Sequence, residues 1–261
     1  MSWLLLLDPP APAAWNMALD EALLGAAETE GLRCLRLYAW DPPALSFGRN
    51  EPARRRYDRA AIAARGLATV RRPTGGRAVW HHREVTYCVT APASTFGTLR
   101  QTYVEIHAML AQALNAIGAR VTLAPPPPPD RPAAGVGAGA CFASVAGGEV
   151  MAQGGAKVVG SAQVRRGGAF LQHGSILLEA GQDLVAGLTL DTADPPAATG
   201  LGERLGPGAT FEVVAGAVAR TAAGRWGAPL PAAPGGVPAG VRARAALLRA
   251  RYEDPAWTWR R

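Results

Sequence analysis

Lysine is nearly missing from this sequence. Of its 27 lysine and arginine residues only Lys157 is a lysine, in a chain rich in alanine, glycine, proline and arginine. Such a bias replaces lysine wherever a positive charge is enough, so a lysine that remains can be one whose compact, deprotonatable amine is needed. Lys157 is therefore a candidate catalytic residue, and the alternative is that it survives by chance.

Cysteine and long apolar runs are also scarce. The three cysteines, Cys34, Cys88 and Cys141, are odd in number and lack metal-type spacing, which argues against a disulfide framework and favours a reducing compartment. The apolar run 3–7 ends at Asp8 and is far too short to span a membrane, so we expect it to be a buried first strand. We expect a cytoplasmic protein without a membrane partner.

Motifs for nucleic acids, nucleotides and metals are not found. The arginines behind the net charge of +7 are scattered, apart from those at 54–56, and no aromatic-interleaved basic patch accompanies them. We expect no nucleic-acid partner, since a basic surface also suits an acidic protein. There is no P-loop, no G-x-G-x-x-G fingerprint and no Ser-His-Asp order. His81, His82 and His173 lack a standard zinc spacing, so no metal is expected.

The hydrophobic pattern predicts helices and strands along the whole chain. Helical spacing is found at 14–24, 58–64, 98–117, 184–188, 211–225 and 241–252, and strand patterns at 3–7, 33–40, 44–50, 67–70, 85–89, 121–123, 149–153, 157–164 and 169–178. We expect the half-buried strand 33–40 to form a hairpin with 44–50. The strands between 149 and 178 should form an antiparallel meander.

Polar residues within the helix patterns are given surface or packing roles. Asn16, Asp20 and Glu21 share one side of the first helix, which we interpret as a solvated face. His107 in the segment 98–117 is interpreted as a packed or surface histidine.

The turn between the strand patterns 67–70 and 85–89 has the composition of a binding site. It reads RRPTGGR over residues 71–77 and is followed by two histidines at 81 and 82. Adjacent glycines let backbone N–H groups approach a ligand closely, and arginines suit phosphate or carboxylate. The alternative is an ordinary Gly-Gly hairpin with solvated arginines.

Cys141 is the best candidate for a nucleophile. A thiolate is a strong nucleophile, and a cationic neighbour such as Lys157 would lower the pKa of the thiol. Cys141 follows the Pro/Gly/Ala-rich segment 125–140, which we interpret as a loop that presents it to a site. Cys34 and Cys88 lie in strand patterns and are expected to be buried and inert. The residues alone indicate a single-domain α/β enzyme that uses cysteine and lysine on a small carboxylic or acyl substrate.

Five segments together resemble the catalytic domain of the biotin/lipoate protein ligase superfamily. They are NMALDEA (16–22), PALSFGR (43–49), RRPTGGRAVWH (71–81), KVVGSAQ (157–163) and LQHGSILL (171–178). The resemblance covers most of residues 3–190 in the same order. It implies an α+β fold: a single domain, 1–261, with mixed and antiparallel sheets flanked by helices, and with C-terminal helices, about 210–261, packed on it.

Within this superfamily the sequence is closest to the cysteine-dependent octanoyltransferases. Arg77 stands where ligases usually carry a third glycine, and His82 stands where aspartate is common, which argues against an ATP–magnesium site. The resemblance implies transfer of octanoyl from acyl carrier protein, through a Cys141 thioester, to a lysine of a lipoyl domain such as the glycine-cleavage H protein, without a cofactor. The alternatives are a lipoate ligase that uses ATP and Mg through lipoyl-AMP, and a catalytically silent acyl- or carrier-binding module.

The site residues implied by the resemblance come from both halves of the matching region. Cys141 and Lys157 are the expected catalytic pair. The expected substrate-binding residues are Arg72, Thr74, Gly75, Gly76, Arg77, His81, Gly160, Ser161, Ala162 and His173. All of these except Thr74 and Arg77 should line a narrow apolar tunnel with a polar mouth.

Overall fold

A computed structural model describes residues 2–125, 147–191, 197–227 and 236–261 of the chain. The expected nucleophile Cys141 and nearly all of the segment 125–140 lie outside the described residues, so what was predicted for them stays a prediction. The expected α+β class, with mixed sheets flanked by helices, is confirmed.

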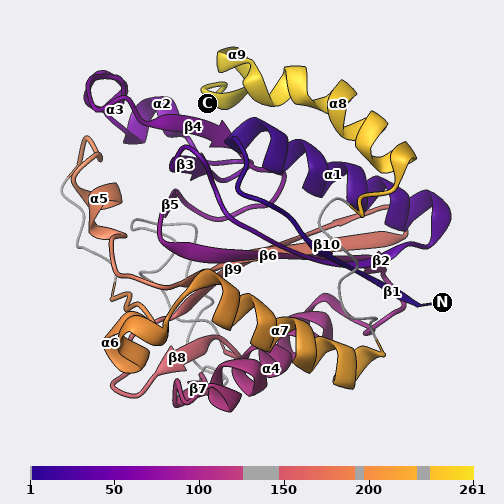
Figure 1. Ribbon diagram of the computed structural model, residues 1–261. Helices are drawn as coiled ribbons and strands as arrows, with labels where there is room; N and C mark the ends of the chain where they lie inside the picture. Colours follow the sequence, from indigo (N-terminus) through magenta and orange to yellow (C-terminus); the bar gives the residue numbers. More distant parts are fainter. Residues whose placement is uncertain (1, 126–146, 192–196, 228–235) are drawn as a thin grey trace, which may run out of the picture.

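A five-stranded sheet forms the centre of the molecule (Figure 1). Its strands lie in the order β1, β2, β6, β10, β9; β1 and β2 are parallel, and the other neighbours are antiparallel. The bounds are β1 (Trp3–Leu7), β2 (Arg33–Tyr38), β6 (Glu84–Pro92), β9 (Val159–Arg166) and β10 (Ala169–Leu177).

Two smaller sheets lie beside the central one. The first has the order β4, β3, β5, in which β3 pairs in parallel with β4 and antiparallel with β5. The second is an antiparallel pair of β7 and β8. The bounds are β3 (Ala44–Phe47), β4 (Ala68–Arg71), β5 (Val79–His81), β7 (Val121–Leu123) and β8 (Val150–Ala152).

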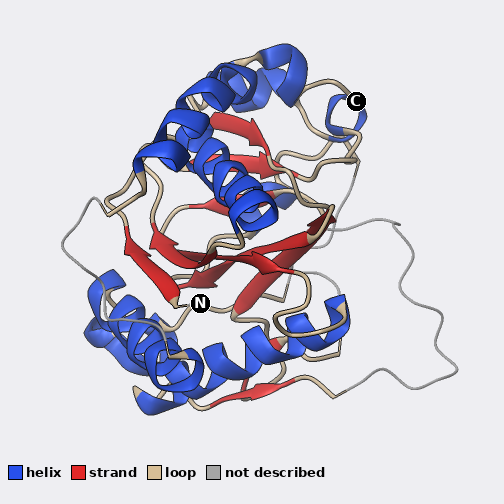
Figure 2. Ribbon diagram, turned by 90° about the vertical axis from the view of Figure 1, so that its right-hand side faces the viewer, coloured by secondary structure: helices blue, strands red, loops and turns tan. Residues whose placement is uncertain are grey.

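Helices cover both faces of the central sheet (Figures 1 and 2). On one face α1 (Ala13–Glu30) packs under α8 (Ala239–Glu253), and on the other α4 (Leu99–Ala116) packs beside α7 (Phe211–Trp226). The short helices are α2 (Ala53–Arg56), α3 (Arg59–Ala64), α5 (Asp183–Ala186), α6 (Gly202–Leu205), η1 (Gly206–Gly208) and α9 (Pro255–Thr258). None of the helices in the described ranges is long and apolar enough to cross a membrane.

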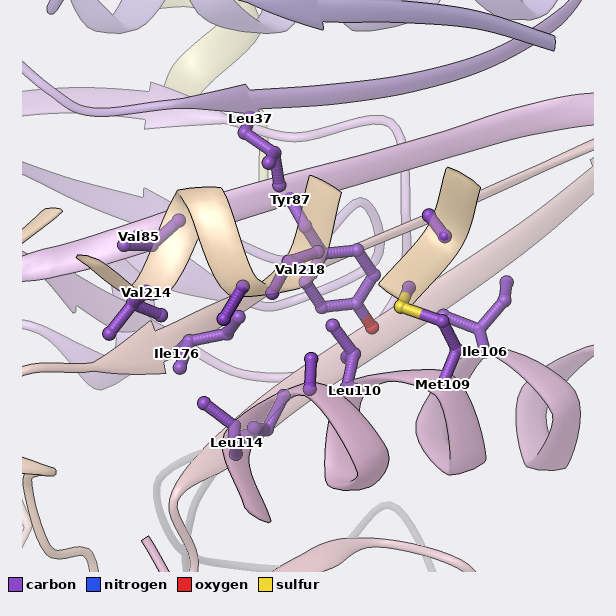
Figure 3. Close-up of a cluster of buried hydrophobic side chains, with 14 of the residues drawn as sticks. Leu37, Val85, Tyr87, Ile106, Met109, Leu110, Leu114, Ile176, Val214 and Val218 are labelled. Atoms are coloured by element: carbon purple, nitrogen blue, oxygen red, sulfur yellow. The ribbon is translucent and has the colours of Figure 1, made fainter. Parts of the chain in front are cut away.

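Each face of the central sheet has its own apolar core. Alternate residues of a strand point to opposite faces, so Val85 and Tyr87 of β6 face α4 and α7, whereas Cys88 faces α1. Met109 and Leu110 of α4 meet the first group (Figure 3). Full burial of one such side chain stabilises the fold by about 1.5–3 kcal/mol. The two cores therefore fix the sheet between its helices.

The expected hairpin between 33–40 and 44–50 is wrong. β2 pairs with β1 and β6 in the central sheet, whereas β3 lies in the three-stranded sheet. The residues between them include Pro42 and Pro43, which have no N–H with which to begin a ladder beside the turn. β2 is also buried on both faces rather than half-buried, because helices cover both sides of its sheet.

The expected meander between 149 and 178 is correct in its second half. β9 and β10 form an antiparallel hairpin across Gly167. β8, however, pairs with β7, and only the bridge between Met151 and Lys157 joins it to the segment that follows. The sequence pattern could not show that the earlier strand β7 supplies the partner of β8.

The solvated helix face expected for Asn16 and Asp20 is also wrong. Both residues are fully buried and bind Arg36 of β2: its Nη1 lies 2.8 Å from Asp20 Oδ1, and its Nη2 donates to Asn16 Oδ1 over 2.8 Å. Asp8 binds the Nε of the same guanidinium over 2.6 Å. A buried charge needs such partners, and helix periodicity alone does not show that a strand arginine supplies one.

Candidate active site

A narrow cavity lies between the central sheet and the three-stranded sheet. Its volume is about 20 Å³, or about 340 Å³ when all space free of atoms at its open mouth is counted. The expected substrate-binding residues that line it are Arg72, His81, Gly160, Ser161, Ala162 and His173. The cavity thus joins two segments that are far apart in the sequence. Hydroxyl and imidazole groups share its walls with Met17, Tyr38, Trp40 and Val79.

Arg72 holds the turn in shape. Its Nη1 donates to the backbone oxygen of Ser46 over 2.9 Å and to Ser46 Oγ over 3.1 Å, while its Nη2 donates to the carbonyls of Gly75 and Arg77 over 2.8 and 2.6 Å. Gly75, Gly76 and Arg77 do not line the cavity. The carbonyls of Gly75 and Arg77 therefore support Arg72, which is not the solvated arginine of an ordinary hairpin.

The second glycine of the turn allows two backbones to meet. Gly76 has φ 90°, in the left-handed region, and its carbonyl lies against Gly48 at the end of β3. A Cβ on Gly48 would come within 1.8 Å of that oxygen. The close approach expected of the glycines is present, but it joins the turn to β3.

His173 connects the turn to the buried charges beneath it. Its Nδ1 donates to Asp20 Oδ2 over 2.9 Å, and its Nε2 lies 2.6 Å from Thr74 Oγ1. Burial opposes the charge of Asp20, but the hydrogen bond from His173 and the charge of Arg36 hold the pKa of that carboxyl below its usual value of 3.8. Burial also lowers the pKa of His173, against the attraction of Asp20. His173 is therefore a neutral imidazole on an ionised carboxylate.

His81 connects a cavity hydroxyl to a second buried carboxylate. Its Nε2 lies 2.7 Å from Ser46 Oγ, and its Nδ1 lies 2.8 Å from Glu84 Oε1. The ring stacks on Trp40 with a centroid distance of 4.0 Å. Glu84 also accepts hydrogen bonds from Thr86 and Ser175, so its carboxylate is held in one place.

His107 behaves differently from these two histidines. Burial lowers its pKa to about 4, and the nearby charge of Lys157 adds to this shift. Its Nδ1 donates to the carbonyl of Gly148 over 2.7 Å, so its Nε2 accepts from Ser161 Oγ over 2.8 Å. Tyr87 in turn lies 2.6 Å from the Ser161 hydroxyl. The chain of hydrogen bonds behind Ser161 is therefore neutral.

Lys157 is buried next to an acid. Only 2 % of its side-chain surface is exposed, and its Nζ donates to Glu149 Oε1 over 2.5 Å. It lies between β8 and β9, where its backbone bridges to Met151 and Ala198. It does not line the cavity itself. Its charge nevertheless acts on His107, which binds the cavity residue Ser161.

The sequence profile of the lipoyl protein ligase A/B catalytic domain matches residues 12–205. The chain belongs to this family. An octanoyltransferase LipM from Kyrpidia tusciae is 38% identical over 275 residues, which cover 100% of this chain and 99% of that protein. One from Moorella thermoacetica is 36% identical, with 100% and 98% covered. The expected superfamily is confirmed, and these relatives support the expected enzyme class, an octanoyltransferase.

Solved structures of lipoate-protein ligases share the fold of this family member. A lipoate-protein ligase A bound with ATP has a TM-score of 0.81 at 19% identity, with 99% of both chains covered. A putative lipoate protein ligase from T. acidophilum with bound lipoic acid gives the same TM-score and identity, with 99% of this chain and 100% of that chain covered. At this identity the likeness shows the fold alone.

The two described cysteines of this family member are remote from solvent. Cys34 and Cys88 are buried in β2 and β6, as expected. Burial raises the pKa of both thiols well above the ordinary range, which disfavours the reactive thiolate. Within the described residues no three histidine, cysteine or acidic side chains gather in a way that could hold a metal ion.

Several polar residues of the site were not found from the sequence. They are Ser46, Glu84, Asp20, Glu149 and His107. Two signals were present: Ser46 lies inside one of the matching segments, and Glu84 follows His81 by three residues. His107 and Glu149 belong to segments whose approach depends on the packing of α4 against β9.

Proposed function

We propose that this chain is a protein octanoyltransferase that moves an octanoyl group from acyl carrier protein to a specific lysine of a lipoyl carrier domain. The observation that carries the proposal is the meeting of residues 72–81 and 160–173 around one narrow cavity. Two relatives named octanoyltransferase align over the whole chain, which supports octanoyl as the transferred group. A solved neighbour from Thermoplasma acidophilum is described with its E2 lipoyl domain, which agrees with such an acceptor.

The proposed chemistry has two steps and needs no cofactor. The Cys141 thiolate attacks the thioester carbonyl, the C–S bond to the carrier breaks, and the carrier thiolate takes up a proton. The neutral amine of the acceptor lysine then attacks the new thioester, the C–S bond to Cys141 breaks, and the proton of the amine passes to the departing thiolate. An amide replaces a thioester, so ATP is not required.

Lys157 is proposed to assist Cys141 from the edge of the site. A buried ammonium beside a thiol favours the thiolate, and Glu149 holds Lys157 in one position. The charge is compact and carries exchangeable protons, which an arginine would not supply. The same group can therefore return a proton during the second step.

The donor is proposed to bind through charge as well as through its acyl chain. The net charge of +7 suits an acidic carrier protein. Burial of the acyl chain gains roughly 0.8 kcal/mol per methylene, so octanoyl donors should react faster than acetyl donors. Equal rates with the two donors would contradict the assignment of the cavity to the chain. Nucleic acid, membrane and metal have no part in the proposal.

The test uses octanoyl carrier protein and mass spectrometry of the intact chain. We expect an added octanoyl mass on the peptide that contains Cys141, which Cys141→Ala and Cys141→Ser abolish, and loss of most transfer in a folded Lys157→Arg variant. The matched controls Cys34→Ser and Cys88→Ser should keep at least partial activity, because those thiols are buried.

A parallel incubation with lipoate and ATP separates the alternatives. Lipoyl-AMP formed from lipoate and ATP would favour the ligase, and acyl binding without adduct or adenylate would favour a silent binding module. If the Cys141→Ala variant transfers octanoyl at a near wild-type rate, the assignment of Cys141 as the nucleophile is wrong.

A further inference from the structure

One hydroxyl of the cavity has the partners of a catalytic serine. Ser46 of β3 lines the cavity, its Oγ lies 2.7 Å from His81 Nε2, and His81 Nδ1 lies 2.8 Å from Glu84 Oε1. Serine, imidazole and carboxylate in this order, at these distances, form the arrangement that serine hydrolases use. The three residues come from β3, β5 and β6, so rigid strands hold them.

The hydrogen bonds fix the direction of proton movement. Glu84 is an acceptor, so the His81 Nδ1 that faces it carries a hydrogen. In the neutral imidazole the other nitrogen, Nε2, is then free to accept the Ser46 proton. Arg72 has only donors, and its Nη1 donates to Ser46 Oγ over 3.1 Å. The guanidinium thus stabilises negative charge on the oxygen as its proton leaves.

The other three hydroxyl–histidine pairs in the described residues lack one part of this arrangement. Ser175 Oγ lies 3.3 Å from His81 Nδ1, the nitrogen that faces Glu84 and carries its hydrogen, so this nitrogen cannot accept the serine proton. Ser161 lies against His107, but the Nδ1 of that ring faces the carbonyl of Gly148 instead of a carboxylate. Thr74 lies against His173 and Asp20 but does not line the cavity. Among the described hydroxyls, Ser46 alone combines a place in the cavity wall with the Nε2 of a histidine whose Nδ1 faces a carboxylate.

We propose that Ser46, His81 and Glu84 form a second catalytic centre, which hydrolyses medium-chain acyl thioesters and esters in the cavity. Ser46 Oγ attacks the acyl carbonyl while its proton moves to His81 Nε2; the C–S or C–O bond of the substrate breaks, and the leaving group takes that proton. Water then gives a proton to His81 and its oxygen to the acyl ester on Ser46. The ester bond breaks, Ser46 regains the proton, and a free fatty acid leaves.

Hydrolysis of octanoyl-N-acetylcysteamine tests this centre without Cys141. In the Cys141→Ala background we expect thiol release that falls by roughly 10²-fold on adding Ser46→Ala or Glu84→Gln, the usual size of a lost proton-transfer partner. Thr90→Val is the matched control: it removes a buried β6 hydroxyl outside the cavity and should leave hydrolysis unchanged. Equal hydrolysis with and without Ser46 would overturn the proposal.

A covalent probe keeps the proposal testable if those variants fold poorly. An octyl fluorophosphonate applied to folded Cys141→Ala should add its mass to the peptide that contains Ser46, and octanoate should slow the labelling. Absence of label, or label on Ser161 or Ser175 instead, would refute the assignment. Because both readouts omit Cys141, they stand apart from the octanoyl adduct that tests the transferase.

Discussion

The two faces of the central sheet bury polar groups in different ways. On the face covered by α1 and α8, Arg36 is surrounded by Asp8, Asp20 and Asn16, so full charges lie next to one another. On the face covered by α4 and α7, Tyr87 and His107 meet through Ser161 beside an apolar cluster (Figure 3). The first face balances a cluster of charges around Arg36, whereas the second contains a neutral chain of hydrogen bonds next to the single ion pair of Lys157 and Glu149.

This difference shows what each face can tolerate. A buried charge is stable only while its partners remain, since an unpaired ion in the interior costs several kcal/mol. A neutral hydrogen-bond chain tolerates the loss of one member more easily but cannot accept a proton without cost. We therefore expect different losses of unfolding free energy from variants that remove a charge, an apolar side chain, a titratable group or a hydroxyl from these faces.

The largest effect is expected from Arg36→Met. The variant leaves Asp8 and Asp20 buried without their shared cation, so unfolding free energy should fall by about 3–5 kcal/mol in urea titrations at pH 7. Adding Asp8→Asn and Asp20→Asn should restore part of that stability by removing the unpaired charges. A loss below about 1 kcal/mol for the single variant would contradict the balance of charges.

Leu110→Ala should be the next largest change, on the other face. Leu110 is fully buried against the sheet, and its truncation leaves a cavity that costs about 3 kcal/mol of unfolding free energy. The exposed Leu247 is the control, because Leu247→Ala should change stability by less than about 0.5 kcal/mol. Similar losses in the two variants would show that the α4 face is not a packed core.

A smaller effect is expected from acid. The pKa of His107 is about 4 in the fold against 6.5 when unfolded, so the unfolded chain binds more protons below pH 6.5 and stability falls as the pH is lowered. Between pH 8 and pH 5 the protonation of His107 in the unfolded chain should lower the free energy of unfolding by about 2 kcal/mol, as measured by urea titrations. His107→Gln should remove that share of the pH dependence. If the pH dependence of stability does not change in this variant, the acid sensitivity arises instead on the face covered by α1 and α8.

The smallest effect is expected from Thr90→Val. Thr90 of β6 is fully buried on the face covered by α1 and α8, and its Oγ1 has no hydrogen-bond partner within the described ranges. Replacing this unsatisfied hydroxyl with a methyl group of similar shape should leave the midpoint of urea unfolding unchanged or slightly higher. A loss above about 1 kcal/mol would reveal a role for this hydroxyl in the charge balance.

Local sequence patterns predict most helices and strands and the segments that line the cavity. They do not predict which strands pair or which side chains bind one another. The periodicity of 98–117 predicted α4, and the matching motifs predicted Arg72, His81, Ser161 and His173 as neighbours of one cavity. The partner of a strand or of a buried charge depends on long-range packing, which periodicity does not contain. Helix periodicity therefore predicts a solvent position for Asp20, although it lies under His173.

Part of the site cannot be predicted from the sequence, because Ser46 stands 35 positions before His81 and meets it only in the folded chain. Ser46, His81 and Glu84 form no familiar motif along the chain, and they become neighbours only when β3, β5 and β6 are brought together. A triad is defined by geometry and not by sequence position. A search for a familiar order of residues could not have found it.

The backbone of the turn is anchored by the last helix, and this has a consequence for the order of folding. Arg71 donates through Nε to the carbonyl of Thr258 over 2.9 Å, and Trp257 Nε1 donates to the carbonyl of Arg71 over 3.3 Å. These contacts join residues nearly two hundred positions apart. During synthesis the strands that border the cavity can pair before α9 emerges, since the N-terminal part of a chain folds first. The turn beside Arg72 then gains this support only after α9 has left the ribosome, so the site is completed long after its own strands have been made.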